Sequence, residues 1–215
     1  MDAAPDAPFT LARARDWLSG FHDRILASET LLTDLDSAIG DADHGTNMAR
    51  GVRAVISQPE ASAAPSLEAL LRGAGMALVA SVGGASGPLY GTFFLRCAGG
   101  LAAVDSVDAA VLAAALRLGL NGIAERGRAS VGDKTLLDAL APAVAAFEVA
   151  TAAGEGLAQA AARASAAADA GRDGTEPLQA RRGRAAYLGE RSIGHVDPGA
   201  TSMALLIEAL AAASR

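Results

Sequence analysis

The feature that most restricts the fold is the stretch from Gly73 to Leu95, which contains no charged residue. Its length meets the criterion of about 20 apolar residues for a helix that spans a membrane. Several glycines, the polar Ser81 and Ser86, and Pro88 would, however, interrupt such a helix near its centre. We therefore expect two shorter helices, joined by the segment VGGASGP and packed within a globular protein.

The glycine-rich connection between these two helices can have either of two roles. Its backbone N–H groups, together with the hydroxyl group of Ser86, could hold an anion. Alternatively, the connection is a tight turn that lets the two helices pack closely. The segment alone does not decide between these interpretations.

Composition favours helices over strands. Hydrophobic residues make up 51% of the 215 residues, whereas aromatic residues make up only 4%. Alanine, leucine and glycine fill most apolar positions, which is typical of closely packed helices. The length suits one domain with a sizeable core. We predict an all-α fold in a single domain, residues 1–215.

Charge and the first residues of the chain restrict its partners and location. A formal net charge of −6 argues against nucleic acid or an anionic membrane as the main partner. The opening MDAAPDAPFT has no basic segment of the kind that begins a secretory signal, so we expect a cytoplasmic protein. The single cysteine, Cys97, cannot form a disulfide within the chain and is expected to be a small buried residue.

Several further helices follow from apolar residues at helical spacing, which we place at residues 10–28, 46–57, 106–125 and 155–170. Thr10 can cap the first of these helices, whose Trp17 and Phe21 lie on one apolar face. Pro59 ends the second helix, and residues 60–66, EASAAPS, are expected to form a short loop.

Three aspartates, Asp36, Asp41 and Asp43, crowd into the stretch from Leu31 to Gly51. Asp36 lies near the end of a helix that Gly40 stops, and the other two follow in a turn. The next helix directs its free N–H groups back at them, an arrangement that attracts phosphate. Because Mg²⁺ bridges phosphate to carboxylate oxygens, we interpret the stretch as a metal and phosphate site. The alternative is a solvated acidic loop with a helix cap.

A calcium-binding EF-hand loop does not fit the acidic stretch. Counting from Asp41, Gly45 comes one place too early, and Val52 stands where the bidentate glutamate is needed. Gly45 is expected instead to let the backbone approach a ligand closely.

Residues 127–135 nearly match a nucleotide-binding P-loop. They read G-x-x-x-x-G-D-K-T, with Asp133 inserted between the second glycine and Lys134. Since no strand is expected before them, we interpret the segment as a capped helix start with Asp133 at the N-terminus. A functional use of this loop stays open.

The last informative stretch runs from Gln179 to Ser202. Four arginines precede the turn Asp197-Pro198-Gly199, and a closing helix begins near Ala200. Arginine binds phosphate through two parallel hydrogen bonds, so the stretch could contact a phosphate. A polar surface loop is the alternative, although irregular loops of this length are often functional.

Four motifs stand in order along the chain: IGDADHGTNMARG, VGGASGPLYGTFF, GDKTLLDALAP and GRAAYLGERSIGHVDPGATS. Together they closely resemble the nucleotide-binding L subunit of dihydroxyacetone kinase, in the form that is a separate chain with phosphoenolpyruvate as the ultimate phosphoryl donor. The similarity covers nearly the whole chain.

The resemblance implies an antiparallel barrel of about eight α-helices, with tightly bound ADP and a pair of Mg²⁺ ions in the loops at one end. Asp36, Asp41 and Asp43 match the metal ligands, and His44, Gly45, Thr46 and Asn47 match the helix start that meets the phosphates. Ala85 and Ser86 match contacts of the glycine-rich loop. Gly127, Leu136 and Arg184 match further nucleotide contacts, and Asp197, Pro198 and Gly199 match the turn that closes on the nucleotide.

The resemblance also implies a phosphotransferase mechanism shared among subunits. Bound ADP is phosphorylated in place by a phosphocarrier subunit, and the γ-phosphoryl group passes to dihydroxyacetone on a substrate-binding subunit. Phosphoryl transfer depends mainly on positioning and charge neutralisation, which Mg²⁺ and Arg184, the candidate catalytic residue, could supply. We expect His44 to bind the nucleotide or to orient Asp41, and His195 to shape its turn, rather than either to carry phosphate.

Three alternatives stay open. The chain could serve an ATP-dependent kinase of dihydroxyacetone or of another short ketose. It could be a regulatory module that, loaded with ADP, contacts a transcriptional regulator. It could also be a metal-binding helical scaffold without turnover. We also expect the chain to form a homodimer.

Overall fold

The computed structural model describes residues 7–58 and 63–215. The N-terminal segment MDAAPD, Pro59 and the first part of the expected loop at 60–66 lie outside these residues. The α-helices are α1 Leu11–Ala27, α2 Glu29–Ile39, α3 His44–Ser57, α5 Leu67–Ser81, α6 Ser86–Gly99, α7 Ala109–Gly127, α8 Leu136–Ala152, α9 Leu157–Asp173 and α10 Pro198–Ala213. A 3-10 helix, η1, spans Arg184–Ser192, and two short strands are β1 Phe9–Thr10 and β2 Ser106–Val107.

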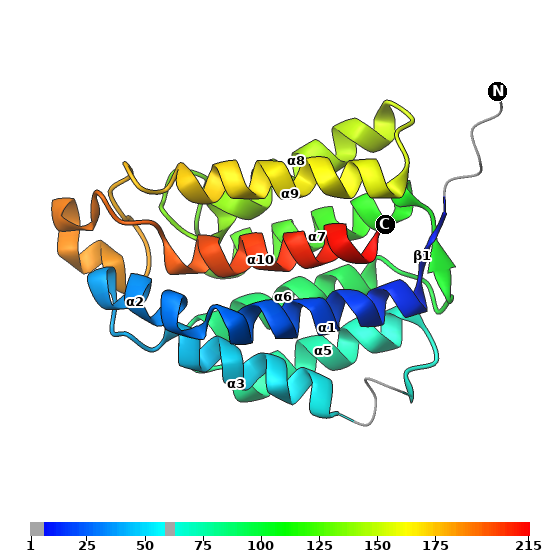
Figure 1. Ribbon diagram of the computed structural model, residues 1–215, viewed down its shortest axis with the longest axis horizontal. Helices are drawn as coiled ribbons and strands as arrows, with labels where there is room; N and C mark the ends of the chain where they lie inside the picture. The colour runs from blue at the N-terminus through cyan, green and yellow to red at the C-terminus, as the bar shows by residue number, and fades with distance from the viewer. Residues whose placement is uncertain (1–6, 59–62) are drawn as a thin grey trace.

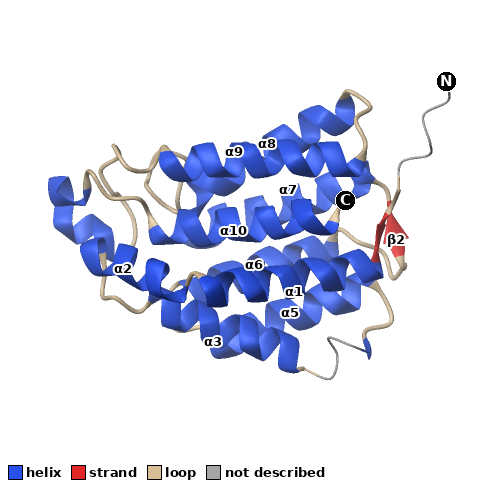
Figure 2. Cartoon of the chain, in the orientation of Figure 1, coloured by secondary structure: helices blue, strands red, loops and turns tan. Residues whose placement is uncertain are grey.

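The long helices lie side by side along the longest axis of the molecule (Figure 1). Each packs on the next, in the order α1, α3, α5, α6, α7, α8, α9 and α10, and α10 packs back on α1. Helix α2 and η1 lie at one end, on the left in Figure 1, and the small sheet lies at the other. The fold is therefore mostly helical, with its loops gathered at two ends (Figure 2).

Trp17 of α1 joins three helices in the core. Its ring meets Phe93 and Phe94 of α6 with centroids 6.5 and 5.5 Å away, and its Nε1 donates to the Leu206 carbonyl of α10 at 2.9 Å. Burial of each such side chain contributes about 1.5–3 kcal/mol to folding. Thr10 caps α1 by accepting a hydrogen bond from the Arg13 N–H group, as the sequence predicts.

The charge-free stretch forms two helices, α5 and α6, as predicted from its glycines. At their contact, a Cβ atom added to Gly91 would lie 2.9 Å from the Gly75 carbonyl oxygen, so only glycine permits this approach. In the described parts of the chain, no helix is long and apolar enough to cross a membrane.

The boundaries of several elements differ from those predicted. Ser106 and Val107 pair with β1 instead of opening a helix, so the all-α prediction is wrong for this small antiparallel sheet. Helix α7 begins only at Ala109, because the Asp108 side chain caps it. Helix α3 begins at His44, two residues before the predicted start, and α10 begins at Pro198, whose fixed φ suits a first turn.

The capped helix start predicted at residues 132–135 is confirmed. Thr135 is the N-cap of α8, and it forms a capping box with Asp138. Asp133 lies in the preceding turn, where its carboxylate accepts a hydrogen bond from the Ser130 N–H group at 2.9 Å.

Helix α10 begins at a buried carboxylate. Asp197 is 8% exposed, and its Oδ2 accepts a hydrogen bond from the Ala200 N–H group at 2.7 Å. Burial raises the pKa of Asp197 from 3.8 to about 7, against the opposing hydrogen bond from Ala200. Nearby Asp138 and Asp36 also raise this pKa, while Lys134 lowers it. The folded protein therefore holds a proton here that the unfolded chain has lost near neutral pH.

Replacing Asp197 by Asn should remove a pH dependence of stability. Between pH 3.8 and about 7 the folded state binds more protons at Asp197 than the unfolded state, so this group makes stability fall as pH rises. The fall is at most about 1.4 kcal/mol per pH unit. Urea unfolding in a chelator, at pH values from 4 to 8, should show Asp197→Asn gaining stability relative to the parent through this window.

Asp108→Asn is the matched control, because it changes an exposed helix cap that accepts a hydrogen bond from the Val111 N–H group. Parallel stability curves for Asp197→Asn and the parent at every pH would contradict the raised pKa.

Candidate functional site

A cavity of about 760 Å³ opens at the end of the molecule where α2 and η1 lie. This volume is typical of small-molecule sites. Among the described helices, α3, α6, α8 and α10 begin at its wall, where His44, Ser86, Leu136 and Pro198 stand as first residues. Four helix N-termini, each the positive end of a helix dipole, therefore meet at one cavity, which suits an anion.

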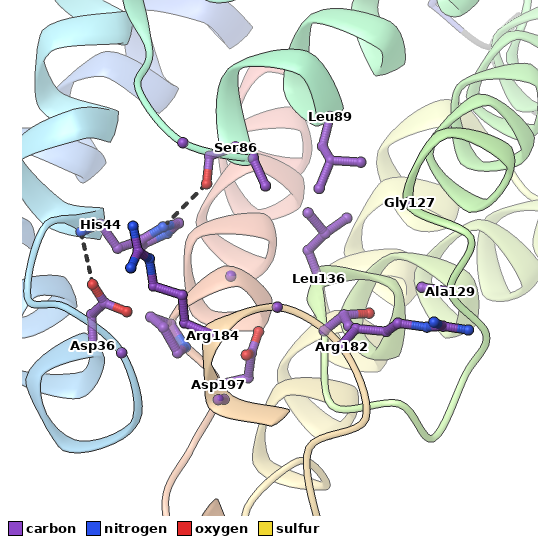
Figure 3. A pocket seen from close by; sticks show the side chains of 18 of the residues that line it. Asp36, His44, Ser86, Leu89, Gly127, Ala129, Leu136, Arg182, Arg184 and Asp197 are labelled. Carbon is purple, nitrogen blue, oxygen red and sulfur yellow. Dashed lines mark hydrogen bonds between the residues drawn. The ribbon is translucent and has the colours of Figure 1, made fainter. Parts of the chain in front are cut away.

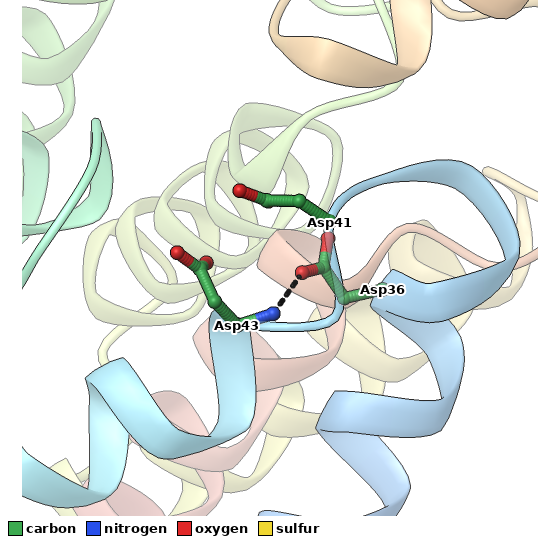
Figure 4. A group of neighbouring side chains, drawn as sticks. All are labelled: Asp36, Asp41 and Asp43. Atoms are coloured by element: carbon green, nitrogen blue, oxygen red, sulfur yellow. Dashed lines mark hydrogen bonds between the residues drawn. The ribbon is translucent and has the colours of Figure 1, made fainter.

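The three predicted aspartates form one cluster at the edge of this cavity (Figure 4). Asp36, Asp41 and Asp43 each offer a carboxylate oxygen within 4.8 Å of the others. Asp36 is fixed, because its Oδ2 accepts hydrogen bonds from the N–H groups of Asp43 at 2.8 Å and His44 at 3.1 Å. Between the other two, Ala42 has a φ of 60°, an uncommon conformation for a residue with a side chain.

Gly40 leaves room for the Asp36 carboxylate. A Cβ atom on Gly40 would lie only 2.1 Å from Asp36 Oδ1, so any other residue would push the carboxylate away. The cluster thus has one oriented carboxylate and two exposed ones. Oxygen donors in this arrangement fit a hard divalent cation such as Mg²⁺.

Arg184, at the start of η1, reaches the same cluster. Its Nη2 lies 2.9 Å from Asp41 Oδ2, and its side chain is 69% exposed. Exposed ion pairs contribute little to stability, so a ligand can replace this one at small cost. The loop between α9 and α10 therefore places a cation where the acidic cluster meets solvent.

His44 is held by hydroxyl groups. Its Nε2 lies 2.8 Å from Ser202 Oγ and its Nδ1 lies 3.4 Å from Ser86 Oγ, while Ser202 also bonds the buried hydroxyl of Tyr90 (Figure 3). Burial lowers the pKa of His44 below 6.5, although Asp36 and Asp43 oppose this shift. The ring is neutral near pH 7. Its nitrogens meet serines and not Asp41, whose orientation was one of the two roles expected of His44.

Gly45, Thr46 and Asn47 are not among the described residues that line the cavity. A Cβ atom on Gly45 would lie 2.1 Å from the Glu29 carbonyl oxygen, so this glycine permits close packing of α3 on α2, while its approach to a ligand stays a prediction. Asn47 Oδ1 accepts from Arg50 Nη2 at 2.6 Å and lies under Gly83 of the glycine-rich loop.

The glycine-rich loop lines the cavity with Gly83, Gly84, Ala85 and Ser86. Gly84 has a φ of +64°, which favours glycine, and no atom would obstruct a side chain there. Its conformation rather than close packing explains the glycine. The loop and the first turn of α6 therefore present backbone N–H groups and the Ser86 hydroxyl group to the cavity.

The opposite wall is apolar. Leu89 of α6 and Leu136 of α8 face each other across the cavity, with Gly127 and Ala129 beside them (Figure 3). Two facing leucines form a slot that suits a flat ring. Sequence reasoning found Gly127 and Leu136 only through the resemblance and missed Leu89, which directly follows the glycine-rich loop, and Ala129.

The remaining predicted residues also meet at the cavity. Asp197, Pro198 and Gly199 line it at the start of α10, and Gly199 lies against Leu136, since a Cβ atom there would be 3.6 Å from Leu136 Cβ. Arg182, one of the four arginines that precede the Asp197 turn, lines the cavity as well. The cavity thus joins an apolar slot to a charged end.

The chain is similar to a known family and to proteins of known description. Residues 38–212 match the family described as the DAK2 domain. The chain is 42% identical over 200 residues to the PEP-dependent dihydroxyacetone kinase, ADP-binding subunit DhaL, of Escherichia coli (strain K12), covering 93% of this chain and 95% of that one. It is 43% identical over 196 residues to a subunit of the same description from Listeria innocua, covering 90% and 92%.

A longer protein also matches in structure. The dihydroxyacetone kinase of C. freundii in complex with AMP-PNP and Mg²⁺ superposes with a TM-score of 0.67 at 26% identity, over 99% of this chain and 36% of that one. This chain therefore spans about a third of that kinase but nearly all of the separate subunits. The family match extends over most of the sequence, and the chain belongs to the DAK2 domain family.

Proposed function

We propose that this chain is the ADP-binding subunit of a dihydroxyacetone kinase. A phosphocarrier subunit phosphorylates the bound ADP in place, and the γ-phosphoryl group passes to dihydroxyacetone on a substrate-binding subunit. The observation that carries the proposal is the cavity itself, in which an apolar slot leads to helix N-termini and an acidic cluster at the mouth. The names of the separate, full-length relatives support it.

The cavity suggests how ADP lies. The adenine ring fits the slot between Leu89 and Leu136, because that wall is apolar. The phosphates then reach the glycine-rich loop and the N–H groups at the start of α6, with the Ser86 hydroxyl group as a further donor. His44, neutral and bonded to Ser202 and Ser86, fixes the direction of that hydroxyl group. The turn at Asp197 closes the space beneath Leu136.

Asp36, Asp41 and Asp43 would hold Mg²⁺. The resemblance to the L subunit implies a pair of these ions. The metal would supply positive charge that offsets the charge of the phosphates beside these carboxylates. Arg184 moves from Asp41 to the transferring phosphoryl group and neutralises charge that develops on its oxygens. The residues of this chain thus bind, orient and neutralise, while the ketose comes from another subunit.

The proposal also includes the arrangement of the helices and the partners of the chain. The closed order of helix contacts from α1 to α10 supports an antiparallel barrel of eight helices with the site at one end. The cytoplasmic location, the homodimer and contact with a transcriptional regulator stay predictions. The alternative is an ATP-dependent subunit, which would exchange ATP freely instead of retaining ADP.

Replacing Asp43 by Asn should greatly weaken ADP retention while the helices persist. The change removes one oxygen ligand and leaves the diphosphate charge uncompensated, so we expect at least a roughly tenfold loss of affinity for ADP with Mg²⁺. Calorimetry measures the affinity and circular dichroism the fold. Asp41→Asn should act likewise but also frees Arg184.

Asp34→Asn is the matched control, because Asp34 is an exposed aspartate on α2, close in sequence to the cluster. Parental affinity for ADP and Mg²⁺ in Asp43→Asn would show that the metal assignment is wrong.

Protein purified without added nucleotide should carry ADP. Helix N-termini and metal ions act on one ligand together, and a ligand bound this way stays with the folded state. Denaturation followed by chromatography of the supernatant measures the nucleotide, with Asp43→Asn purified in parallel. A nucleotide-free preparation that is fully active and exchanges ATP freely would favour the ATP-dependent alternative.

Alone, the chain should not phosphorylate dihydroxyacetone. In-line transfer needs the acceptor oxygen opposite the γ-phosphorus, and a second subunit has to deliver the ketose to the mouth near Arg184. The measurement is dihydroxyacetone phosphate formed by this chain, a substrate-binding subunit and either a phosphocarrier charged from phosphoenolpyruvate or ATP, with each component omitted in turn. Sustained turnover by this chain alone with ATP would refute the subunit proposal.

A further inference from the structure

Lys134 is the only lysine in the sequence. The rest of the 18 lysines and arginines are arginines. Lys134 is also buried, at 1% exposure. Its Nζ donates to five backbone carbonyls, those of Thr175, Glu176, Leu178, Ser192 and His195, at distances from 2.5 to 3.4 Å. All five partners are backbone atoms, so this ammonium group fixes the conformation of the backbone and contacts no side-chain acceptor in these bonds.

The five carbonyls come from both ends of one loop. Residues 175–178 follow α9, and residues 192–195 precede α10. The segment between them contains Arg182, Gly183 and Arg184, which line the cavity. One cation therefore ties together the two ends of the loop that presents Arg184.

The same cage reaches the turn at the start of α10 through Thr175. The Thr175 carbonyl accepts from Lys134 Nζ at 2.9 Å, and the Thr175 hydroxyl oxygen accepts from the Asp197 N–H group at 2.9 Å. Thr175 is fully buried. A shift of this residue would therefore move the Asp197-Pro198-Gly199 turn.

The backbone beneath Lys134 is fixed in an unfavourable conformation. Lys134 has a φ of +60°, in the region that favours glycine. The Asp138 carboxylate holds this turn by accepting hydrogen bonds from the N–H groups of Gly132 and Thr135. Such strain persists where surrounding contacts enforce it, commonly at functional sites.

Arginine could not replace this lysine. An ammonium group is a compact charge with three rotatable donors, whereas guanidinium is a planar fork. The near-match to a P-loop would direct the lysine at phosphate, but this Nζ is already surrounded by carbonyls. Lys134 thus acts on the loop and not on the phosphate itself.

We propose that Lys134 is a positioning residue for the nucleotide: its ammonium group, caged by carbonyls, holds the α9–α10 loop so that Arg184 and the Asp197 turn close on bound ADP. This proposal rests on the proposed function, because it takes ADP as the ligand. It predicts that removal of the ammonium group loosens the loop that carries Arg184 and leaves the three aspartates of the acidic cluster in place.

The test compares Lys134→Met and Lys134→Arg with the parent. Both variants should release ADP at least about tenfold faster, since loss of positioning commonly costs this much or more. Affinity of the nucleotide-free protein for Mg²⁺ should not fall, because the acidic cluster lies where α2 ends and α3 begins, and release of Arg184 from Asp41 only frees a carboxylate. Arg163→Met, which removes an exposed cation paired with Glu155, is the control and should release ADP as the parent does.

A rescue experiment separates positioning from loss of fold. Lys134→Ala leaves space for a small amine, so ethylammonium should slow ADP release from this variant at least about threefold, while ethanol should not. Since the parent has a single lysine, its ¹⁵Nζ resonance should be visible as one protected ammonium signal when the protein is labelled with ¹⁵N-lysine.

Parental ADP release in Lys134→Met, or equal release from Lys134→Ala with ethylammonium and with ethanol, would overturn the proposal. A parent that retains no ADP at all would instead refute the proposed function, which makes the two failures distinguishable.

Discussion

Two hydrogen bonds from the start of α3 to the carboxylate of Asp36 join the elements on which the site depends. They fix the end of α2 against the N–H groups of Asp43 and His44, and they leave the Asp41 and Asp43 side chains exposed beside them. Gly40 is part of the same constraint, because a Cβ atom there would displace the carboxylate. The acidic cluster is therefore a consequence of how one helix ends and the next begins.

Charge balance explains why helices start at this end of the molecule. Asp36, Asp138 and Asp197 are buried close to the cavity. Neighbouring carboxylates disfavour the charged form of one another, as Asp138 and Asp36 do for Asp197. The N-termini of α3, α6, α8 and α10 and the ammonium group of Lys134 offset this charge from the protein side. An alternating arrangement of up and down helices brings these N-termini to one end, so the topology itself makes the site suitable for a charged ligand.

Sequence reasoning predicted features whose cause is local. Glycines and Pro88 divide the charge-free stretch, Thr10 caps α1, and three aspartates near Gly40 form a cluster, each for reasons that lie within a few residues. Features that need distant partners escaped it: the pairing of Ser106 and Val107 with β1, the contact of His44 with Ser202, and Leu89 opposite Leu136. The close approach of α2 to Gly45 is likewise invisible in sequence. Lys134 shows the same limit, since its five carbonyl partners lie some forty to sixty residues away in the chain.

The two ends of the cavity differ in a way that bears on how subunits divide the reaction. The apolar slot lies between α6 and α8, whereas Arg184 and Tyr187 at the charged end are 69% and 89% exposed. In the proposed function, the base and ribose end of the nucleotide is enclosed by this chain and the end that reacts is open to solvent. An enclosed base favours a nucleotide that stays bound through many cycles, because most of its contacts are unaffected by transfer at the far end. An open reacting end lets a phosphoryl donor and an acceptor approach in turn, but it also admits water, so exclusion of water requires the surface of another subunit.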